Sequence, residues 1–299
     1  MKKLFLLIFA VLLLAGCGEQ NPGTNNGKLK IVTSFFPMYL DAINIAGGID
    51  SVEIINLTQP QTGCLHDYQL TPEDMKTLET ADIFIVNGVG MESFLDKVTE
   101  SNKNLKIIDA SESDEIFLLK NGEEINPHVW VSVTYSMSQV KAITRQLCEL
   151  DPTHAEIYKK NALDYLNKLT TLRDEMHLAL DNLPNKDIVT FHEAFPYFAS
   201  EFKLNIVATI ESEPGIEPTP QELIDIVRKV NYLPVKVLFT EPQYSPTAAE
   251  TIARETGAKI YTLDPVTTGD ATTGNANAYI DRMKTNMNTL VEALNTNAG

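Results

Sequence analysis

The sequence predicts an α/β protein of two lobes, each a mainly parallel β-sheet flanked by helices, joined by one long rigid helix. Three observations predict this class. Apolar, β-branched runs alternate with amphipathic segments early in the chain, a stretch with only helical patterns follows, and the alternation then resumes. Strands that alternate with helices favour parallel sheets. About 270 residues remain beyond the N-terminal leader, which is enough for two medium lobes with full cores.

The first lobe is expected at residues 30–150. Residues 71–74, Thr-Pro-Glu-Asp, have the pattern of a helix start: a capping threonine, proline at the first helical position and acids in the first turn. Residues 38–46 and 130–150 are predicted as further helices. Four strands are expected, at residues 30–36, 52–57, 81–87 and 105–109.

Residues 151–183 are predicted to form a linking spine helix. Asp151 can cap it, Pro152 suits its first position, and apolar residues recur at three- and four-residue steps: Leu163, Leu166, Leu169, Leu172, Met176 and Leu180. A helix of about 30 residues would be about 45 Å long, longer than a small lobe is wide. We therefore expect it to join two lobes.

The second lobe is expected at residues 184–299, with the architecture of the first but without a sequence repeat. Its helices are predicted at residues 192–202, after Thr219, from Ser245 to Gly257, and around the apolar positions between Ile280 and Leu294. Its strands are expected at residues 187–191, 205–210, 235–240 and 259–263.

The N-terminal residues predict the compartment. A basic start and an apolar run from Leu4 to Leu14 lead into Leu14-Ala15-Gly16-Cys17, which resembles the lipobox of a bacterial lipoprotein. The resemblance implies a signal peptide at residues 1–16 and a lipid on Cys17. Residues 17–29, rich in Asn and Gly, are predicted to be a flexible tether. We expect an extracytoplasmic protein anchored to the outer face of the cell membrane, or in the periplasm if an outer membrane exists.

Charge and cysteine content narrow the partners. The formal net charge of −16 argues against binding nucleic acid or lying on anionic lipid. Beyond Cys17 the chain has two cysteines, Cys64 and Cys148. An exported pair can form a disulfide, but their positions in the sequence do not show that they meet, so the pairing stays open.

The candidate site is a metal site between the lobes. Three of the five histidines, His66, His128 and His192, stand in turn-rich stretches; His66 and His192 follow predicted strands, and Asp264 closes another. Open α/β sheets bind ligands outside the carboxyl ends of their strands. Three imidazoles and one carboxylate suit tetrahedral Zn²⁺, whereas Mn²⁺ prefers more oxygen. His154 and His177, on the spine, are expected to be structural.

The segments around these histidines carry a family resemblance. Residues 63–72, 126–130 and 190–198, with residues 217–220, 240–243 and 263–265, are similar to the motifs of substrate-binding lipoproteins of bacterial ABC transporters for zinc and manganese. The resemblance implies His66, His128, His192 and Asp264 as ligands. Manganese members generally have glutamate at the position of His192, so the zinc branch is favoured, with a manganese- or iron-binding member as the alternative.

Some positions depart from the family pattern. Leu65 stands where proline is usual and Gln69 where glutamate is common, and the histidine-rich insertion of many zinc members is missing. The corresponding residues, 109–126, are acidic and are read as a solvated loop. Cys64 is considered as a ligand but disfavoured, because a free exported thiolate is prone to oxidation. Glu193 and Glu241 are predicted to orient a ligand histidine through hydrogen bonds.

The function predicted is capture and delivery, not catalysis. Zn²⁺ would displace protons from the imidazoles and bridge the lobes, and the loaded monomer would dock on a membrane permease with its ATPase partner. One alternative is an exported metallohydrolase, with Asp264 or Glu193 as general base. The chain has no HExxH or GxSxG motif to support it. A second alternative is a surface adhesin on the same scaffold.

Overall fold

The structure is a computed structural model that describes residues 27–66, 68–122, 124–211, 218–234 and 236–295. The predicted signal peptide, the lipidation residue Cys17 and most of the tether lie outside the described residues, as does Glu217. Among the helices in the described ranges, none is long and apolar enough to cross a membrane.

The first sheet contains four parallel strands in the order β2-β1-β3-β4. The strands are β1 (Leu29–Thr33), β2 (Val52–Asn56), β3 (Ile83–Val86) and β4 (Lys106–Asp109). Three helices accompany them: α1 (Phe36–Ala46), α2 (Pro72–Glu79) and α3 (Leu95–Ser101). Strand β1 ends at Thr33 rather than at Phe36 as predicted. Pro37 lies in the first turn of α1, where its missing N–H costs no hydrogen bond, so the helix begins earlier than the sequence suggested.

The second sheet repeats this topology. Its strands, β7 (Asp187–Thr190), β8 (Asn205–Thr209), β9 (Val237–Thr240) and β10 (Lys259–Thr262), are parallel and lie in the order β10-β9-β7-β8. Numbered from its own first strand, this is the order of the first sheet. Helices α6 (Pro196–Phe202), α7 (Pro220–Asn231) and α8 (Thr247–Thr256) connect its strands. The prediction of two parallel sheets with matching architecture is therefore confirmed.

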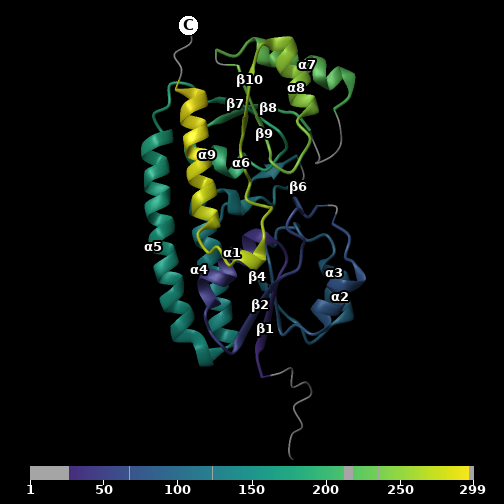
Figure 1. Cartoon of the computed structure of the whole chain (residues 1–299), viewed down its shortest axis with the longest axis vertical. Coiled ribbons are helices and arrows are strands. Elements are labelled where there is room, and N and C mark those ends of the chain that lie inside the picture. Colours follow the sequence, from purple (N-terminus) through teal and green to yellow (C-terminus); the bar gives the residue numbers. More distant parts are fainter. Residues whose placement is uncertain (1–26, 67, 123, 212–217, 235, 296–299) are drawn as a thin grey trace, which may run out of the picture.

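Three longer helices lie along one side of the molecule, and one of them extends beside both sheets (Figure 1). They are α4 (Val133–Leu150), α5 (Ala155–Leu180) and α9 (Ala278–Leu294). Helix α5 packs against α1 and α4 beside the first sheet and against α9 beside the second. It has 26 residues, hence a length of about 39 Å. A 3-10 turn at Pro152–His154 precedes it, so the predicted spine is present but shorter than residues 151–183.

Apolar side chains form one large core that extends through both halves. The buried stripe of α5 contributes Leu169, Leu172, Met176 and Leu180, each at most 1% exposed. Burial of such a side chain stabilises the fold by about 2 kcal/mol. Leu163, assigned to this stripe from the sequence, is instead 59% exposed, while its neighbour Ala162 is buried.

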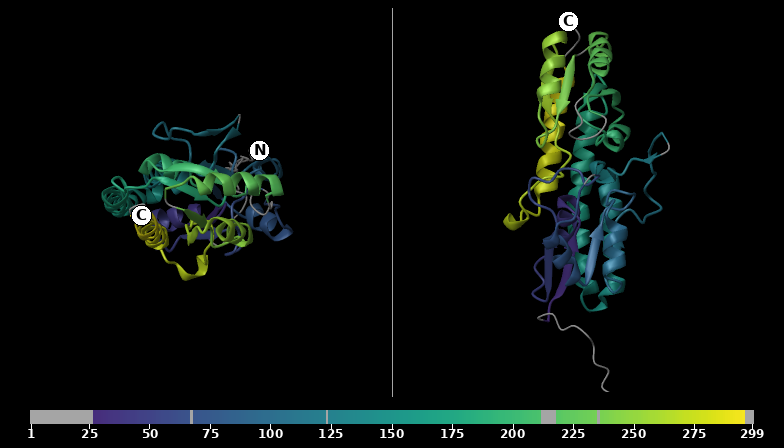
Figure 2. Two further views of the ribbon diagram at one scale, coloured as in Figure 1. Left: turned by 90° about the horizontal axis from the view of Figure 1, so that it is seen from above. Right: turned by 90° about the vertical axis from the view of Figure 1, so that its right-hand side faces the viewer.

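The acidic stretch after β4 is not only a solvated loop. It contains a short antiparallel hairpin, β5 (Lys120–Asn121) with β6 (Glu124–Ile125), which projects from the body (Figure 2). Its acids also bind α4: Glu115 accepts hydrogen bonds from Ser138 (3.0 Å) and from Lys141 (2.7 Å). Its described acids, Glu112, Asp114, Glu115 and Glu124, are exposed, as expected for a solvated stretch, and the hairpin is the feature that the prediction lacked.

Candidate metal centre

Three histidines from three separate loops converge where the two halves meet. His66 lies in the loop after β2, His128 precedes the 3-10 turn Val129–Val131, and His192 follows β7. The Nε2 atoms of His66 and His128 are 3.2 Å apart, and the ring centroids of His128 and His192 are 5.3 Å apart. Two of these loops follow the carboxyl ends of parallel strands, the position expected for a ligand site.

A cysteine thiol lies between two of these imidazoles. The Sγ atom of Cys64 is 3.4 Å from Nε2 of His128 and 3.4 Å from Nε2 of His192. The ligand atoms of Cys64, His66 and His128 all lie within 4.8 Å of one another. Cys64 and Cys148 are both free, which answers the open question of their pairing. The sequence indicated Cys64 only by its place two residues before His66.

His192 does not lie on a helix, contrary to the prediction for residues 192–202. Helix α6 begins only at Pro196, because proline is favoured in the first turn of a helix and excluded from its interior. Residues 191–195 form an irregular turn, and the His192 side chain, 1% exposed, lies in the interior beside Cys64.

Glu241, at the end of β9, fixes the His192 ring. Its Oε1 atom is 2.5 Å from Nδ1 of His192, and both side chains are buried. Although burial alone would lower the pKa of His192, the charge of Glu241, with the contact to Cys64, raises it well above its usual value. A ring held at Nδ1 presents Nε2 to a metal ion, which is the usual arrangement of a ligand histidine and its carboxylate partner.

The His128 ring is held by a neighbour that sequence reasoning missed. Oδ1 of Asn126 is 3.0 Å from the backbone N of His128, which donates to it, and 3.0 Å from Nδ1 of the ring. Burial, followed by the charges of His192 and His66, lowers the pKa of His128 well below its usual value. The ring is therefore neutral at physiological pH and ready to coordinate. The signal was an asparagine two residues before the histidine, where Asx turns form.

The loop after β3 holds the segment that contains His128 through a hydrogen bond. The Nδ2 group of Asn87 donates to the carbonyl oxygen of Pro127 at 2.9 Å. Glu92 in turn accepts hydrogen bonds from the backbone N–H groups of Asn87 (2.8 Å) and Gly88 (3.1 Å). Glu92 is buried, and this burial raises its pKa to about 7 despite the two amides.

The loop that contains His66 is anchored on α2. The Tyr68 hydroxyl donates to Oδ2 of Asp74 at 2.9 Å, and Asp74 forms the predicted capping box with Thr71. Burial, together with the hydrogen bond to Asp74, raises the pKa of Tyr68 to about 12. These contacts join the position of His66 to the start of a helix whose sequence pattern was recognisable.

Asp264 follows β10, and its carboxylate already has two partners. Its Oδ1 accepts from the backbone N–H of Val266 at 2.7 Å, and its Oδ2 is 3.1 Å from Arg282. Burial raises its pKa, while Arg282 and the Val266 amide act in the opposite direction. The Asp264 segment adjoins the His128 segment, because the indole of Trp130 donates to the carbonyl oxygen of Pro265 at 2.7 Å.

Comparisons with known proteins identify the family of this chain. A family model described as zinc-uptake complex component A, periplasmic, matches residues 31–293. The chain belongs to this zinc-uptake family. The manganese-binding lipoprotein MntA of Halalkalibacterium halodurans is 31% identical over 98% of this chain and 99% of its own. The high-affinity zinc uptake system protein ZnuA of Bacillus subtilis is 29% identical, with 97% of each covered.

Solved structures of similar proteins have the same fold. The SBP FpvC from P. aeruginosa, solved in complex with Ni²⁺, is 33% identical, with a TM-score of 0.79 over 89% of this chain and 97% of that one. The family resemblance predicted from the motifs is therefore confirmed.

The remaining predicted residues have structural surroundings. His154 lies 2.6 Å from Asp151 and 2.9 Å from the Ser51 hydroxyl, and His177 lies 3.0 Å from Asp181, as expected for structural residues. The carboxylate that contacts the ring of His192 is that of Glu241. Glu193 contributes its backbone carbonyl, which accepts from the Asn126 amide at 2.8 Å, and an orienting role for its carboxylate stays a prediction.

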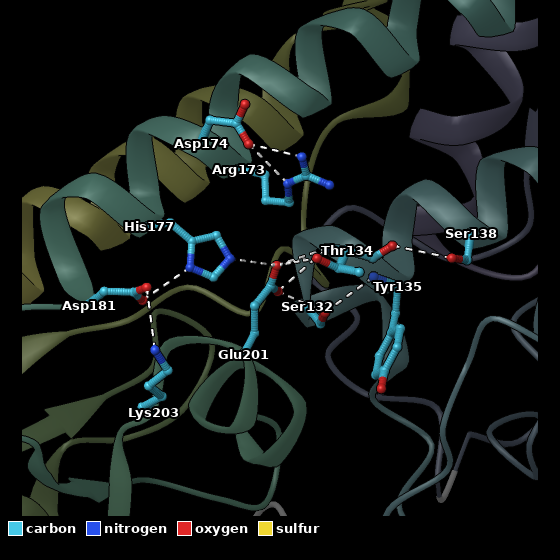
Figure 3. A network of polar contacts seen from close by, with 10 residues as sticks. All are labelled: Ser132, Thr134, Tyr135, Ser138, Arg173, Asp174, His177, Asp181, Glu201 and Lys203. Atoms are coloured by element: carbon cyan, nitrogen blue, oxygen red, sulfur yellow. Dashed lines mark hydrogen bonds and ion pairs between the residues drawn. The ribbon is translucent and has the colours of Figure 1, made fainter.

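A buried carboxylate on α6 connects the second half of this zinc-uptake family member to the start of α4 (Figure 3). Glu201 accepts hydrogen bonds from the hydroxyl of Ser132 (2.7 Å) and from the hydroxyl (2.5 Å) and backbone N–H (3.1 Å) of Thr134. A carboxylate at the N-terminus of a helix also complements the helix dipole. Since Ser132 lies four residues after His128, Glu201 helps to position the His128 segment relative to α6.

Proposed function

We propose that this protein captures Zn²⁺ outside the cytoplasm and delivers it to an ABC permease for import, driven by the permease's ATPase partner. The convergence of His66, His128 and His192 carries the proposal, because three imidazoles in one place form a preorganised set of zinc ligands. The predicted fourth ligand, Asp264, stays a prediction: both of its oxygens already accept from protein groups. Membership of the zinc-uptake family supports the same function.

The chemistry of the site favours zinc over manganese. Imidazole suits Zn²⁺, whereas Mn²⁺ selects carboxylate and carbonyl oxygens. The carboxylates of Glu241 and Asp264 are already engaged, Glu241 by His192 and Asp264 by Arg282. A manganese-binding role is the alternative that the relative MntA supports.

Capture requires that protons leave the ligands. His128 is neutral before the ion arrives, whereas His192 carries a proton stabilised by Glu241. Binding of Zn²⁺ expels that proton, so affinity for the ion falls as the pH is lowered. At the permease, return of the proton to His192 can release Zn²⁺.

The proposed location follows from the leader sequence. A lipid on Cys17 would hold the protein at the membrane, with residues 17–29 as a tether long enough to let a monomer reach its permease. The relative MntA is named a lipoprotein, which supports this location.

The experiment is a competitive titration of Zn²⁺ against Mn²⁺ with the mature chain, combined with metal analysis. We expect one Zn²⁺ per chain in the wild type, and a large loss of affinity in His128→Ala and in His192→Glu. His154→Ala is the matched control, because His154 contacts Asp151 and Ser51 and not the site. Equal binding by wild type and both site variants would contradict the proposal.

A further inference from the structure

Cys64 occupies a position that the proposed function does not use. Its sulfur lies 3.4 Å from Nε2 of His128 and 3.4 Å from Nε2 of His192, and it is a free thiol. These two histidines come from opposite halves of the molecule, so Cys64 contacts both halves where they meet. Cys148, the other cysteine described, lies on α4 and donates to the Ala155 carbonyl at 3.6 Å.

The distances can be compared with those of a tetrahedral zinc site. Bond lengths of about 2.3 Å to sulfur and about 2.05 Å to nitrogen separate a sulfur from a nitrogen ligand by about 3.5 Å, and two nitrogens by about 3.3 Å. The corresponding separations here are 3.4 Å from Cys64 to each of two imidazoles and 3.2 Å from His66 to His128. These three separations are therefore close to those that one ion would impose. The ligand atoms of Cys64, His66 and His128 form the group that lies within 4.8 Å, and His192 adjoins this group through its contact with Cys64.

We infer that the Cys64 thiolate is a ligand of the captured ion and completes a set of one sulfur and three imidazoles. The inference rests on the proposed function, because it concerns the same site. It leaves Asp264 in its ion pair with Arg282, so ion capture does not need to break that salt bridge. When the ion binds, the thiol proton leaves to solvent and a metal–sulfur bond forms, without oxidation or reduction of either partner.

The backbone before Cys64 packs closely against the second half of the molecule. A Cβ atom at Gly63 would lie 2.7 Å from the hydroxyl oxygen of Tyr244, so a larger residue here would displace the end of that side chain. Tyr244 in turn lies edge-on to the His192 ring, with centroids 5.5 Å apart. A thiolate also biases the site further toward Zn²⁺ and away from Mn²⁺, because soft ligands select zinc.

Cobalt provides the test, because Co²⁺ takes the place of Zn²⁺ in tetrahedral sites and a cobalt–thiolate bond has an intense charge-transfer absorption in the near ultraviolet. The parent protein is the mature chain with Cys17→Ser. Co²⁺ is added to the parent and to two variants that carry Cys64→Ser or Cys148→Ser in addition, and the three absorption spectra are compared. We expect the absorption in the parent and in Cys148→Ser, and its loss in Cys64→Ser. Zn²⁺ affinity of Cys64→Ser should fall at least about tenfold, since even the loss of a ligand's hydrogen-bonding partner costs that much.

The outcomes separate the two proposals. Stoichiometric Co²⁺ binding by the parent without the charge-transfer absorption would overturn the role of Cys64 and leave metal capture by the histidines intact. An absorption that persists in Cys64→Ser would also overturn it. Failure of the parent to bind Co²⁺ or Zn²⁺ would overturn the proposed function, and this inference with it.

Discussion

Glu92 makes the stability of the metal-free protein depend on pH in a direction opposite to that of most acids. Its pKa is about 7 in the fold, against 4.5 for an exposed glutamate, because burial disfavours the charged form. A folded-state pKa above the unfolded value gives stability that is complete below pH 4.5 and is lost as the pH rises through 7. The carboxyl group binds its proton more tightly in the folded chain, so proton loss favours unfolding.

The magnitude follows from the two pKa values. The full shift corresponds to about 3 kcal/mol, at 1.36 kcal/mol per unit. Between pH 5 and pH 8 the linkage relation gives a loss of about 2.5 kcal/mol from this group alone. In Glu92→Gln this loss should disappear. The variant should also be less stable by about 1–3 kcal/mol at pH 5, because an amide has one acceptor oxygen for the two backbone N–H groups of Asn87 and Gly88.

Urea unfolding of both proteins at pH 5 and pH 8, in the presence of a chelator, measures these differences. All other titrating groups are common to the two chains, so the change in wild-type stability minus that of Glu92→Gln isolates Glu92. A difference near zero would refute the reasoning. Since Asn87 bonds to Pro127, Glu92→Gln should also loosen the His128 segment, which a lower Zn²⁺ affinity at pH 7 would report.

Three further predictions concern contacts between the halves and the binding of Zn²⁺. Glu241→Gln removes the charge beside Nδ1 of His192 and should weaken Zn²⁺ binding about 10- to 100-fold in the competitive titration; unchanged affinity would show that this contact does not tune the ligand. Glu201→Gln leaves one of its two acceptor oxygens for Ser132 and Thr134, and the free energy of unfolding should fall by about 2 kcal/mol in urea; an unmoved midpoint would contradict this. Zn²⁺ at 100 times its dissociation constant should stabilise the protein by about 2.7 kcal/mol over the chelated form, seen as a higher melting temperature; identical melting curves would argue against tight capture.

Much of the architecture was predictable, because local signals and the global fold agree. Thr71 and Thr219 both form capping boxes with proline at the first helical positions, and these patterns are visible in the sequence. The strands are short β-branched runs, and their alternation with helices identifies parallel sheets. The order of strands within each sheet was not predictable in detail, since it depends on which helix crosses which neighbour.

The candidate site was predictable as a set of loops but not as a set of contacts. The sequence predicts a helix from His192 to Phe202, and the proline at 196 is the signal that the helix begins later. Cys64 was disfavoured on chemical grounds, and its contact with His192, 128 positions away, depends on packing between halves. The pairing of Asp264 with Arg282 was equally hidden, because Arg282 lies on a separate helix, α9.

The contact of residues 271–276 with α1 has a consequence for how the chain folds. Tyr39 donates to the carbonyl oxygen of Ala271, and Asn44 donates to that of Ala276, so α1 bonds to residues 232 positions further along the chain. Contacts of such long range form late, because closure of so large a loop must precede them. Tyr39 and Asn44 therefore lack these partners until residues 271–276 have been synthesised, so α1 completes its native packing only after most of the chain has been made.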